Sequence, residues 1–311
     1  MAMNCFAQSY MEQLHLVARI LPAIARNGEF ELKGGTAINL FERGLPRLSV
    51  DIDLCYPHFS ERAEALGSIV KHLTSIRQDL SKRIHGIKFV NLGVESLEYK
   101  LLCRTPEALV KIEVNTTMRG HVFPIRTMPV HPDAEEILGQ YTEMPVISRE
   151  ELYGGKICAA LDRQHPRDLF DLAPFLSGSG NGFDRRIVFG FIICLLSHNR
   201  PLHELLAPNA HDMKEAFDNQ FVGMSAMPFT YEDYVKTREM LFAALPALLD
   251  DADRKFLVSF AEGAPDWSLF EVPDAARLPA ILWKLRNIDI LKERSPRKFD
   301  DQCAILREVL K

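Results

Sequence analysis

Two aspartates separated by one residue, Asp51 and Asp53, are the first candidates for chemistry in this sequence. The stretch around them, LSVDIDLCY, alternates apolar and polar residues, and residues two apart on a strand share one face. Two carboxylates so close repel each other unless a cation lies between them. Because hard oxygen ligands favour Mg²⁺ or Mn²⁺, the pair predicts a metal site, and a solvated strand end is the alternative.

Two glycines and a threonine, Gly34, Gly35 and Thr36, precede the aspartates and join a predicted strand to a predicted helix. Such a turn directs backbone N–H groups and a helix N-terminus to one point, an arrangement that binds phosphate in many proteins. Ser49 shares the strand face of Asp51, and we count it with the turn as a candidate nucleotide-binding residue. The alternative is a tight turn that needs glycine only for its backbone conformation.

A third carboxylate, Glu113, lies in the alternating stretch ALVKIEVN. Its side chain shares the polar face with Lys111 and Asn115, on a strand that could pair beside the strand of the aspartates. We expect Glu113 to complete the catalytic and metal-binding carboxylates. An exposed strand glutamate is the alternative.

Lys156 and Asp168 are candidates in the helical part of the chain. Lys156 follows two glycines in YGGKICAALDR, but this is no Walker A motif, because a preceding strand and a following Ser or Thr are missing. Glycine inside a helix costs about 1 kcal/mol relative to alanine, which predicts close approach to another helix or to a ligand that Lys156 reaches. Asp168 and Asp171 share a helix face, and a surface ion pair near a helix N-terminus is the alternative for them.

The elements that must position these residues follow from hydrophobic periodicity. Strands are predicted at 29–34 and 48–56 with a helix over 36–44 between them, then a helix over 60–83 and three strand-like stretches, IKFVNL, EYKLLCR and ALVKIEVN. From Ser148 the pattern is helical almost to the end, and SGSGNG at 177–182 is the best linker. We therefore predict an α/β (α+β) protein with a mixed sheet in a domain over 1–176 and a helical domain over 183–311.

Bulk properties restrict the function. The chain has 311 residues, a net charge of -5 and a pI near 6.1, so it has no general attraction for polyanions. Its six cysteines are scattered singly, a pattern typical of reduced thiols in a cytosolic protein. No signal peptide is evident, and the longest apolar run, IVFGFIICLL, falls short of the ~20 residues that span a bilayer. We expect a cytoplasmic protein without membrane segments.

The stretch GGTAINLFERGLPRLSVDIDL, with VKIEVN, KICAALDR and RDLFDL after it, resembles the AbiEii/AbiGii-type (MenT-like) nucleotidyltransferase toxins of type IV toxin–antitoxin systems. The resemblance covers about residues 30 to 175 and implies a DNA-polymerase-β-like fold with a helical C-terminal lobe. It also implies transfer of a nucleotide from an NTP and a cognate antitoxin encoded nearby. By position, it assigns Gly34, Gly35 and Thr36 to phosphate, Asp51 and Asp53 to metal, and Lys156 and Asp168 to the family lysine and acid.

Three hypotheses for the function follow. The first is an enzyme that adds nucleotides to RNA, with a tRNA 3′ end as the acceptor and pyrophosphate as the leaving group; Asp51 and Asp53 bind Mg²⁺ and Glu113 helps to activate the acceptor hydroxyl. The second keeps the chemistry but modifies a protein or a small molecule, since residues 201–280 carry 14 acidic and 6 basic side chains. The third is a non-catalytic nucleotide-binding interaction domain.

Overall fold

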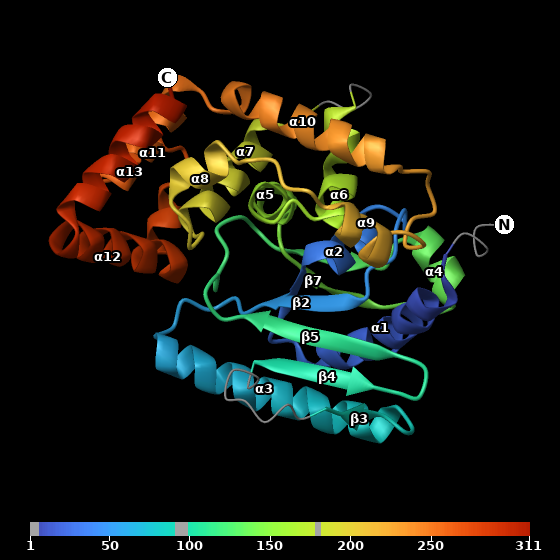
Figure 1. Cartoon of the computed structure of the whole chain (residues 1–311). Coiled ribbons are helices and arrows are strands. Elements are labelled where there is room, and N and C mark those ends of the chain that lie inside the picture. The colour runs from blue at the N-terminus through green and yellow to red at the C-terminus, as the bar shows by residue number, and fades with distance from the viewer. Residues whose placement is uncertain (1–5, 91–98, 178–181) are drawn as a thin grey trace. The chain divides into compact units, whose positions relative to one another are not determined.

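The computed structural model describes residues 6–90, 99–177 and 182–311 (Figure 1). The chain divides into two compact units, which are described separately below: unit 1 contains Met1–Ser148 and Asp218–Phe229, and unit 2 contains Arg149–Phe217 and Thr230–Lys311. The division falls earlier than the boundary between 176 and 183 that the Gly/Ser-rich stretch predicts. The reason is that the helix beginning at Arg149 packs mainly with the helices that follow it.

Unit 1 combines a seven-stranded sheet with helices. In chain order its elements are α1 (Gln8–Asn27), β1 (Glu31–Lys33), α2 (Gly34–Thr36), the π-helical turn η2 (Ala37–Glu42), β2 (Asp51–Cys55), α3 (Arg62–Arg83), β3 (Lys88–Phe89), β4 (Lys100–Arg104), β5 (Leu109–Asn115), β6 (Arg126–Pro129), α4 (Pro132–Leu138) and β7 (Glu143–Val146). The strand order is β3-β4-β5-β2-β1-β7-β6. Because β2 runs parallel to β5 and β1 parallel to β7 while the other neighbours are antiparallel, the predicted mixed sheet is confirmed.

One face of this sheet belongs to the core of unit 1. Helices α1 and α3 pack on each other and against strands, and α3 runs alongside β3 and β4 (Figure 1). Ile52 and Leu54 of β2 and Ile112 of β5 are completely buried. Since alternate strand residues point to opposite faces, burial of these three side chains turns Asp51, Asp53 and Glu113 toward the other face.

The segment after β1 differs in detail from the predicted helix over 36–44. Helix α2 occupies only Gly34–Thr36, and η2 follows with π-helical geometry and ends at Glu42. The chain cannot continue as a helix because Gly44 and Leu45 both have positive φ angles, of 63° and 65°. The N–H of Leu45 donates to the Asn39 carbonyl at 2.6 Å, which folds this loop back toward β2.

A short segment from late in the chain, Asp218–Phe229, belongs to unit 1. It forms an isolated bridge between Arg47 and Ser225, and the N–H of Leu48 donates to the Met224 carbonyl at 2.7 Å. The segment thus holds the loop that leads into β2. No local sequence pattern predicts this return to unit 1.

Unit 2 is helical in its described part, as the repeating apolar pattern predicts. Its elements are α5 (Arg149–Asp162), α6 (Pro166–Leu176), α7 (Arg185–Leu196), α8 (Leu202–Leu206), α9 (Lys214–Gln220, which extends into unit 1), α10 (Tyr231–Leu248), α11 (Asp251–Ala261), η4 (Trp267–Leu269), η5 (Pro273–Arg277), α12 (Pro279–Arg294) and α13 (Pro296–Val309). Helix α5 packs closely on α7, and α6 packs on α5 and α10. None of the helices in the described ranges combines the length and the apolar character that a bilayer crossing needs.

Candidate active site

The three predicted carboxylates of unit 1 lie on neighbouring strands in matching register. Asp53 of β2 pairs with Glu113 of β5 across the parallel ladder. Lys33 of β1 lies beside Asp53 on the other side, and Lys100 of β4 lies beside Glu113. Residues paired in register point to the same face, so the row across four strands reads Lys, Asp, Glu, Lys. The sheet therefore brings together the acids that the sequence suggested.

Glu113 is held by two lysines. The Lys100 ammonium lies 2.7 Å from Oε1 and the Lys111 ammonium lies 2.8 Å from Oε2, and the Glu113 side chain is 30% exposed. Burial alone would raise the pKa of Glu113, but the hydrogen bonds from Lys100 and Lys111 outweigh it and the pKa lies below its usual value. Glu113 is therefore ionised at neutral pH.

Lys111 also interacts electrostatically with Asp51 and Asp53. Its register partner on β2 is Asp51. Burial lowers the pKa of Lys111, but the hydrogen bond to Glu113 and the charges of Asp51, Glu113 and Asp53 together raise it above its usual value. The strand thus supplies a permanent positive charge next to three carboxylates.

The glycine turn lies against this carboxylate face. Gly34 has a φ of 72°, and a Cβ built on it would overlap the carboxylate of Asp53. A Cβ on Gly35 would lie 2.8 Å from the Ser49 hydroxyl and 2.9 Å from the Arg47 guanidinium. Gly34 is thus required by its backbone conformation and by its approach to Asp53, whereas a side chain at Gly35 would have to displace the ends of Ser49 and Arg47.

Thr36 and Ser49 tie the turn to the strand. The Thr36 side chain is completely buried, its hydroxyl donates to the Asp51 carbonyl, and its oxygen lies 3.0 Å from the Ser49 hydroxyl oxygen. Arg47, 2% exposed, donates to the Leu48 carbonyl at 2.8 Å. These side chains hold the glycine turn against the segment that leads into β2.

The donor set of unit 1 fits a hard divalent cation in type. Asp51 and Asp53 offer two carboxylates from one strand face, and Glu113 lies in register beside them. In the conformation described, each oxygen of Glu113 accepts from a lysine. Within the described residues no group of three or more His, Cys, Asp or Glu side chains is close enough to hold a metal ion. Asp51 and Asp53 stay the predicted metal ligands, and Glu113 would join them only by exchanging a lysine.

The remaining predicted residues form a buried charge cluster in unit 2. The Lys156 ammonium, on α5, lies 2.8 Å from Asp168 and 3.1 Å from Asp171, both on α6. Arg163 donates to the two oxygens of Asp168 at 2.6 and 3.0 Å. Burial alone would raise the pKa of Asp168, but the charges of Lys156 and Arg163 hold it well below its usual value. The cluster ties α5 to α6 through ionised groups.

Helix packing accounts for the first of the two glycines before Lys156. A Cβ on Gly154 would overlap the backbone of Gly190 and Phe191 on α7, and a Cβ on Gly190 would overlap the Glu150 carbonyl on α5. A Cβ on Gly155 would meet only the Cys194 sulfur, at 3.6 Å. Of the two alternatives, close approach to another helix is therefore the one observed at Gly154.

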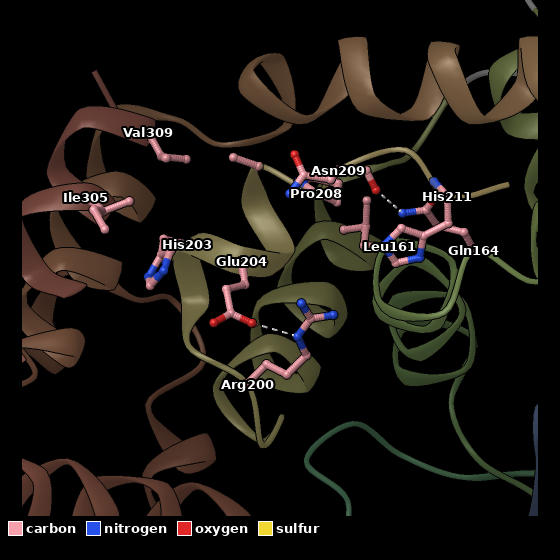
Figure 2. A pocket seen from close by; sticks show the side chains of 11 residues that line it. Leu161, Gln164, Arg200, His203, Glu204, Pro208, Asn209, His211, Ile305 and Val309 are labelled. Carbon is pink, nitrogen blue, oxygen red and sulfur yellow. Dashed lines mark hydrogen bonds and ion pairs between the residues drawn. The ribbon is translucent and has the colours of Figure 1, made fainter. Parts of the chain in front are cut away.

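A cavity of about 280 Å³ in unit 2 lies between α8, α13 and the end of α5 (Figure 2). Arg200 at its wall is paired with Glu204 at 2.8 Å and with Asp162 at 3.0 Å. The buried Gln164 amide bonds the Asn209 carbonyl and the His211 N–H and so fixes the opposite wall. Because the Arg200 guanidinium is already paired with two carboxylates, this cavity offers little attraction for an anion.

Sequence reasoning missed two features of the site. Lys100 lies on a separate strand and reaches Glu113 only through the β4–β5 register, which no local pattern reveals. Arg47, which no motif singled out, is buried beside Gly35. An arginine within an apolar stretch between Leu45 and Leu48 was the one signal for that burial.

A mixed sheet with in-register acids beside a glycine turn characterises the nucleotidyltransferase class of enzymes, and the comparisons agree. Residues 15–287 match the family model described as "Nucleotidyl transferase AbiEii toxin, Type IV TA system". The chain belongs to this family.

One solved structure supports the fold. The chain is similar to MenT4, a nucleotidyltransferase toxin from Mycobacterium tuberculosis H37Rv, with a TM-score of 0.60 and 16% identity over 98% of this chain and 96% of that one. A structure titled "Crystal structure of putative nucleotidyltransferase from H. pylori" is less similar, with a TM-score of 0.46 and 17% identity over 78% of this chain and 99% of that one. The search of curated proteins found no match. The nucleotidyltransferase fold predicted from the sequence is confirmed.

Proposed function

We propose that this nucleotidyltransferase moves a nucleotide from an NTP to an RNA acceptor, a tRNA 3′ end, with release of pyrophosphate. The observation that carries the proposal is the register of the sheet, which sets Asp53 beside Glu113, while Gly34 of the glycine turn packs against Asp53. Carboxylates next to a backbone turn suit a metal–triphosphate complex, because the metal neutralises phosphate charge while N–H groups bind the phosphate oxygens.

Asp51 and Asp53 would hold Mg²⁺ or Mn²⁺, whose charge stabilises the transferred phosphoryl group and the leaving pyrophosphate. Gly34 and Gly35 would bind phosphate oxygens through their backbone, with Thr36 and Ser49 holding the turn in position. Glu113, ionised at neutral pH, would accept a hydrogen bond from the attacking hydroxyl. Lys111 would offset negative charge at the same face.

Lys156 and Asp168 lie in unit 2 and stay predicted members of the catalytic machinery. In the structure Lys156 is paired with Asp168 and with Asp171. A role in transfer therefore requires the Lys156 ammonium to exchange Asp168 for a phosphate oxygen and to keep its contact with Asp171. The family also implies a cognate antitoxin, and we propose that it is encoded nearby.

A second candidate acceptor is a protein or a small molecule. The observation in its favour is charge: the net charge of -5 and the acidic 201–280 stretch attract RNA poorly. The chemistry at Asp51 and Asp53 would be the same.

The test incubates the protein and Mg²⁺ with each α-labelled NTP and with total RNA, purified tRNA or total protein. We expect label on tRNA, and a loss of about 100-fold or more in Asp53→Asn, because a catalytic metal contributes several kcal/mol. Asp133→Asn is the matched control, since that side chain is 72% exposed. Label on protein alone would select the second acceptor, and full transfer by folded Asp53→Asn would contradict the metal site.

A further inference from the structure

The loop after β5 contains a buried arginine whose donors are not satisfied. Arg119 is 5% exposed, and its Nε and one terminal nitrogen, Nη1, are buried without a hydrogen-bond partner in the described structure. The loop around it is well fixed: the Asn115 side chain accepts two backbone N–H groups at 3.0 and 2.9 Å, and the Gly120 N–H donates to the Tyr56 carbonyl at 2.8 Å. The unsatisfied guanidinium is thus held in place by its surroundings.

Such an arrangement is costly without an anion. Arginine stays charged in proteins, and a buried charged donor without a partner costs more than a neutral one. Burial, and then the charge of Arg62, lower the pKa of Arg119, and the charge of Glu61 only partly offsets them. The geometry agrees, because Gly120, next to Arg119, packs closely against Phe59, three residues before Arg62: a Cβ on Gly120 would lie 3.0 Å from the Phe59 ring. The two guanidinium groups therefore belong to neighbouring segments of the chain.

Arg62 lies at the N-terminus of α3, a helix of 22 residues. Its N-cap, Glu61, makes no side-chain capping hydrogen bond, and the first backbone N–H groups of a helix have no partner inside it. The positive end of the helix dipole adds to the two arginines. Glu61, Arg62 and Glu64 lie on the same turn and are all exposed, so solvent screens their three charges alike, and the buried Arg119 is the charge that solvent reaches least.

The same loop lies on the carboxylate face of the sheet. Cys55, two residues beyond Asp53 and on the same strand face, has its sulfur 3.8 Å from the Met118 carbonyl and 3.7 Å from the Gly120 carbonyl. Two strand residues span about 7 Å, so the loop begins roughly that far along the face from Asp53.

From these observations we infer a phosphate-binding subsite formed by Arg119, Arg62 and the first-turn N–H groups of α3. A phosphate oxygen accepts from the unsatisfied guanidinium donors and separates the two repelling cations. The group bound is a phosphate of the NTP or of the acceptor RNA. The choice of these two sources rests on the proposed function, whereas the binding of a phosphate does not.

Inorganic phosphate is the first probe, measured as the rise in Tm of the full chain at constant ionic strength, with chloride as the reference salt. We expect phosphate to raise the Tm of the wild type. Arg62→Gln should need about ten-fold more phosphate for the same rise, since one charge-assisted contact is lost. Arg77→Gln removes the same charge from α3 far from its N-terminus and should behave as wild type.

Arg119→Met removes the buried charge and keeps much of the side-chain volume. We expect its Tm in chloride to equal or exceed that of the wild type, and its response to phosphate to be lost. A wild-type Tm that does not respond to phosphate, or equal responses in Arg62→Gln and Arg77→Gln, would overturn the subsite. The Arg62→Gln comparison decides the question even if Arg119→Met does not fold, because Arg62 is exposed.

Two further arms identify the source of the phosphate. Arg62→Gln should weaken binding of metal-free NTP if the subsite serves the triphosphate, and of a short single-stranded RNA if it serves the acceptor, whereas Arg77→Gln should weaken neither. If neither ligand responds in Arg62→Gln although inorganic phosphate does, the link to substrate is wrong. These binding readouts need no turnover, so failure of the transfer assay and failure of the subsite are distinguishable.

Discussion

Two carboxylates of this protein have nearly the same partners and very different surroundings. Glu113 in unit 1 is paired with Lys100 and Lys111, and its side chain is 30% exposed. Asp168 in unit 2 is paired with Lys156 and Arg163 and is 1% exposed. Each thus accepts from two cationic side chains, and each has a pKa below its usual value.

The two clusters differ in how far their carboxylates are exposed to solvent. Near water, the interaction of charges is screened and a lost partner is replaced by hydration. In the interior, removing one member leaves an uncompensated charge whose desolvation penalty remains. The Glu113 cluster can therefore exchange a partner at small cost, whereas an exchange in the Asp168 cluster, including the one that a catalytic role of Lys156 requires, is costly.

The largest effect on stability is expected for Asp168→Asn. This change keeps the shape but leaves Lys156 with only Asp171 and removes the carboxylate between Lys156 and Arg163, so we expect a loss of about 3 to 5 kcal/mol in the free energy of unfolding. Urea unfolding followed by circular dichroism measures it. A loss below about 1 kcal/mol would remove the contrast between the clusters.

Acid should weaken the same cluster. The folded-state pKa of Asp168 lies below its ordinary value of 3.8, so its contribution to stability is full above that pH and declines as the pH falls toward the folded-state pKa. The wild type should therefore lose stability below about pH 4, more than Asp168→Asn does. Free energies of unfolding measured from pH 7 to pH 3 give the pH dependence of stability for the wild type and for Asp168→Asn. Equal pH dependence in the two proteins would contradict the pairing of Asp168 with Lys156 and Arg163.

Packing of unit 2 gives an intermediate effect. Gly154→Ala places a methyl group against the α7 backbone and should destabilise the protein by about 1 to 3 kcal/mol. Gly155→Ala is the matched variant: its methyl group has room, and the helix gains up to about 1 kcal/mol. Thermal unfolding of the two variants should shift in opposite directions, and equal shifts would mean that the α5–α7 contact is not as close as described.

Sequence periodicity predicted much of the fold and the strand faces on which the three carboxylates lie. Alternation with period two placed Asp51, Asp53 and Glu113 on polar strand faces, and the sheet confirms that β2 and β5 are neighbours. Local pattern works there because strand geometry alone decides which face a side chain takes.

Features that depend on contacts between distant parts of the chain could not be predicted from local sequence patterns. The partner of Gly154 is Gly190 on another helix, and nothing in YGGKICAALDR indicates which helix approaches. Lys156 is a second example, because helix propensity alone predicts that alanine replaces it without loss of stability. Its 6% exposure and its contacts with Asp168 and Asp171 now predict a loss, because burial depends on how α6 folds back and not on helix propensity.

The smallest effect is expected for Glu113→Gln. The substitution leaves Lys100 and Lys111 without their carboxylate, but both lysines are about one-third exposed, at 35% and 36%, and water replaces the lost partner. Exposed pairs of this kind contribute about 0.2 to 1 kcal/mol, so the free energy of unfolding should change by less than about 1 kcal/mol. Added salt should reduce even that difference, since it screens the exposed pairs, while the loss in Asp168→Asn should stay nearly constant. Urea unfolding of both variants at low and high NaCl tests this. A loss in Glu113→Gln as large as that in Asp168→Asn would show that the Glu113 cluster is a structural support, and that neither a metal nor an acceptor hydroxyl could replace a lysine there at small cost.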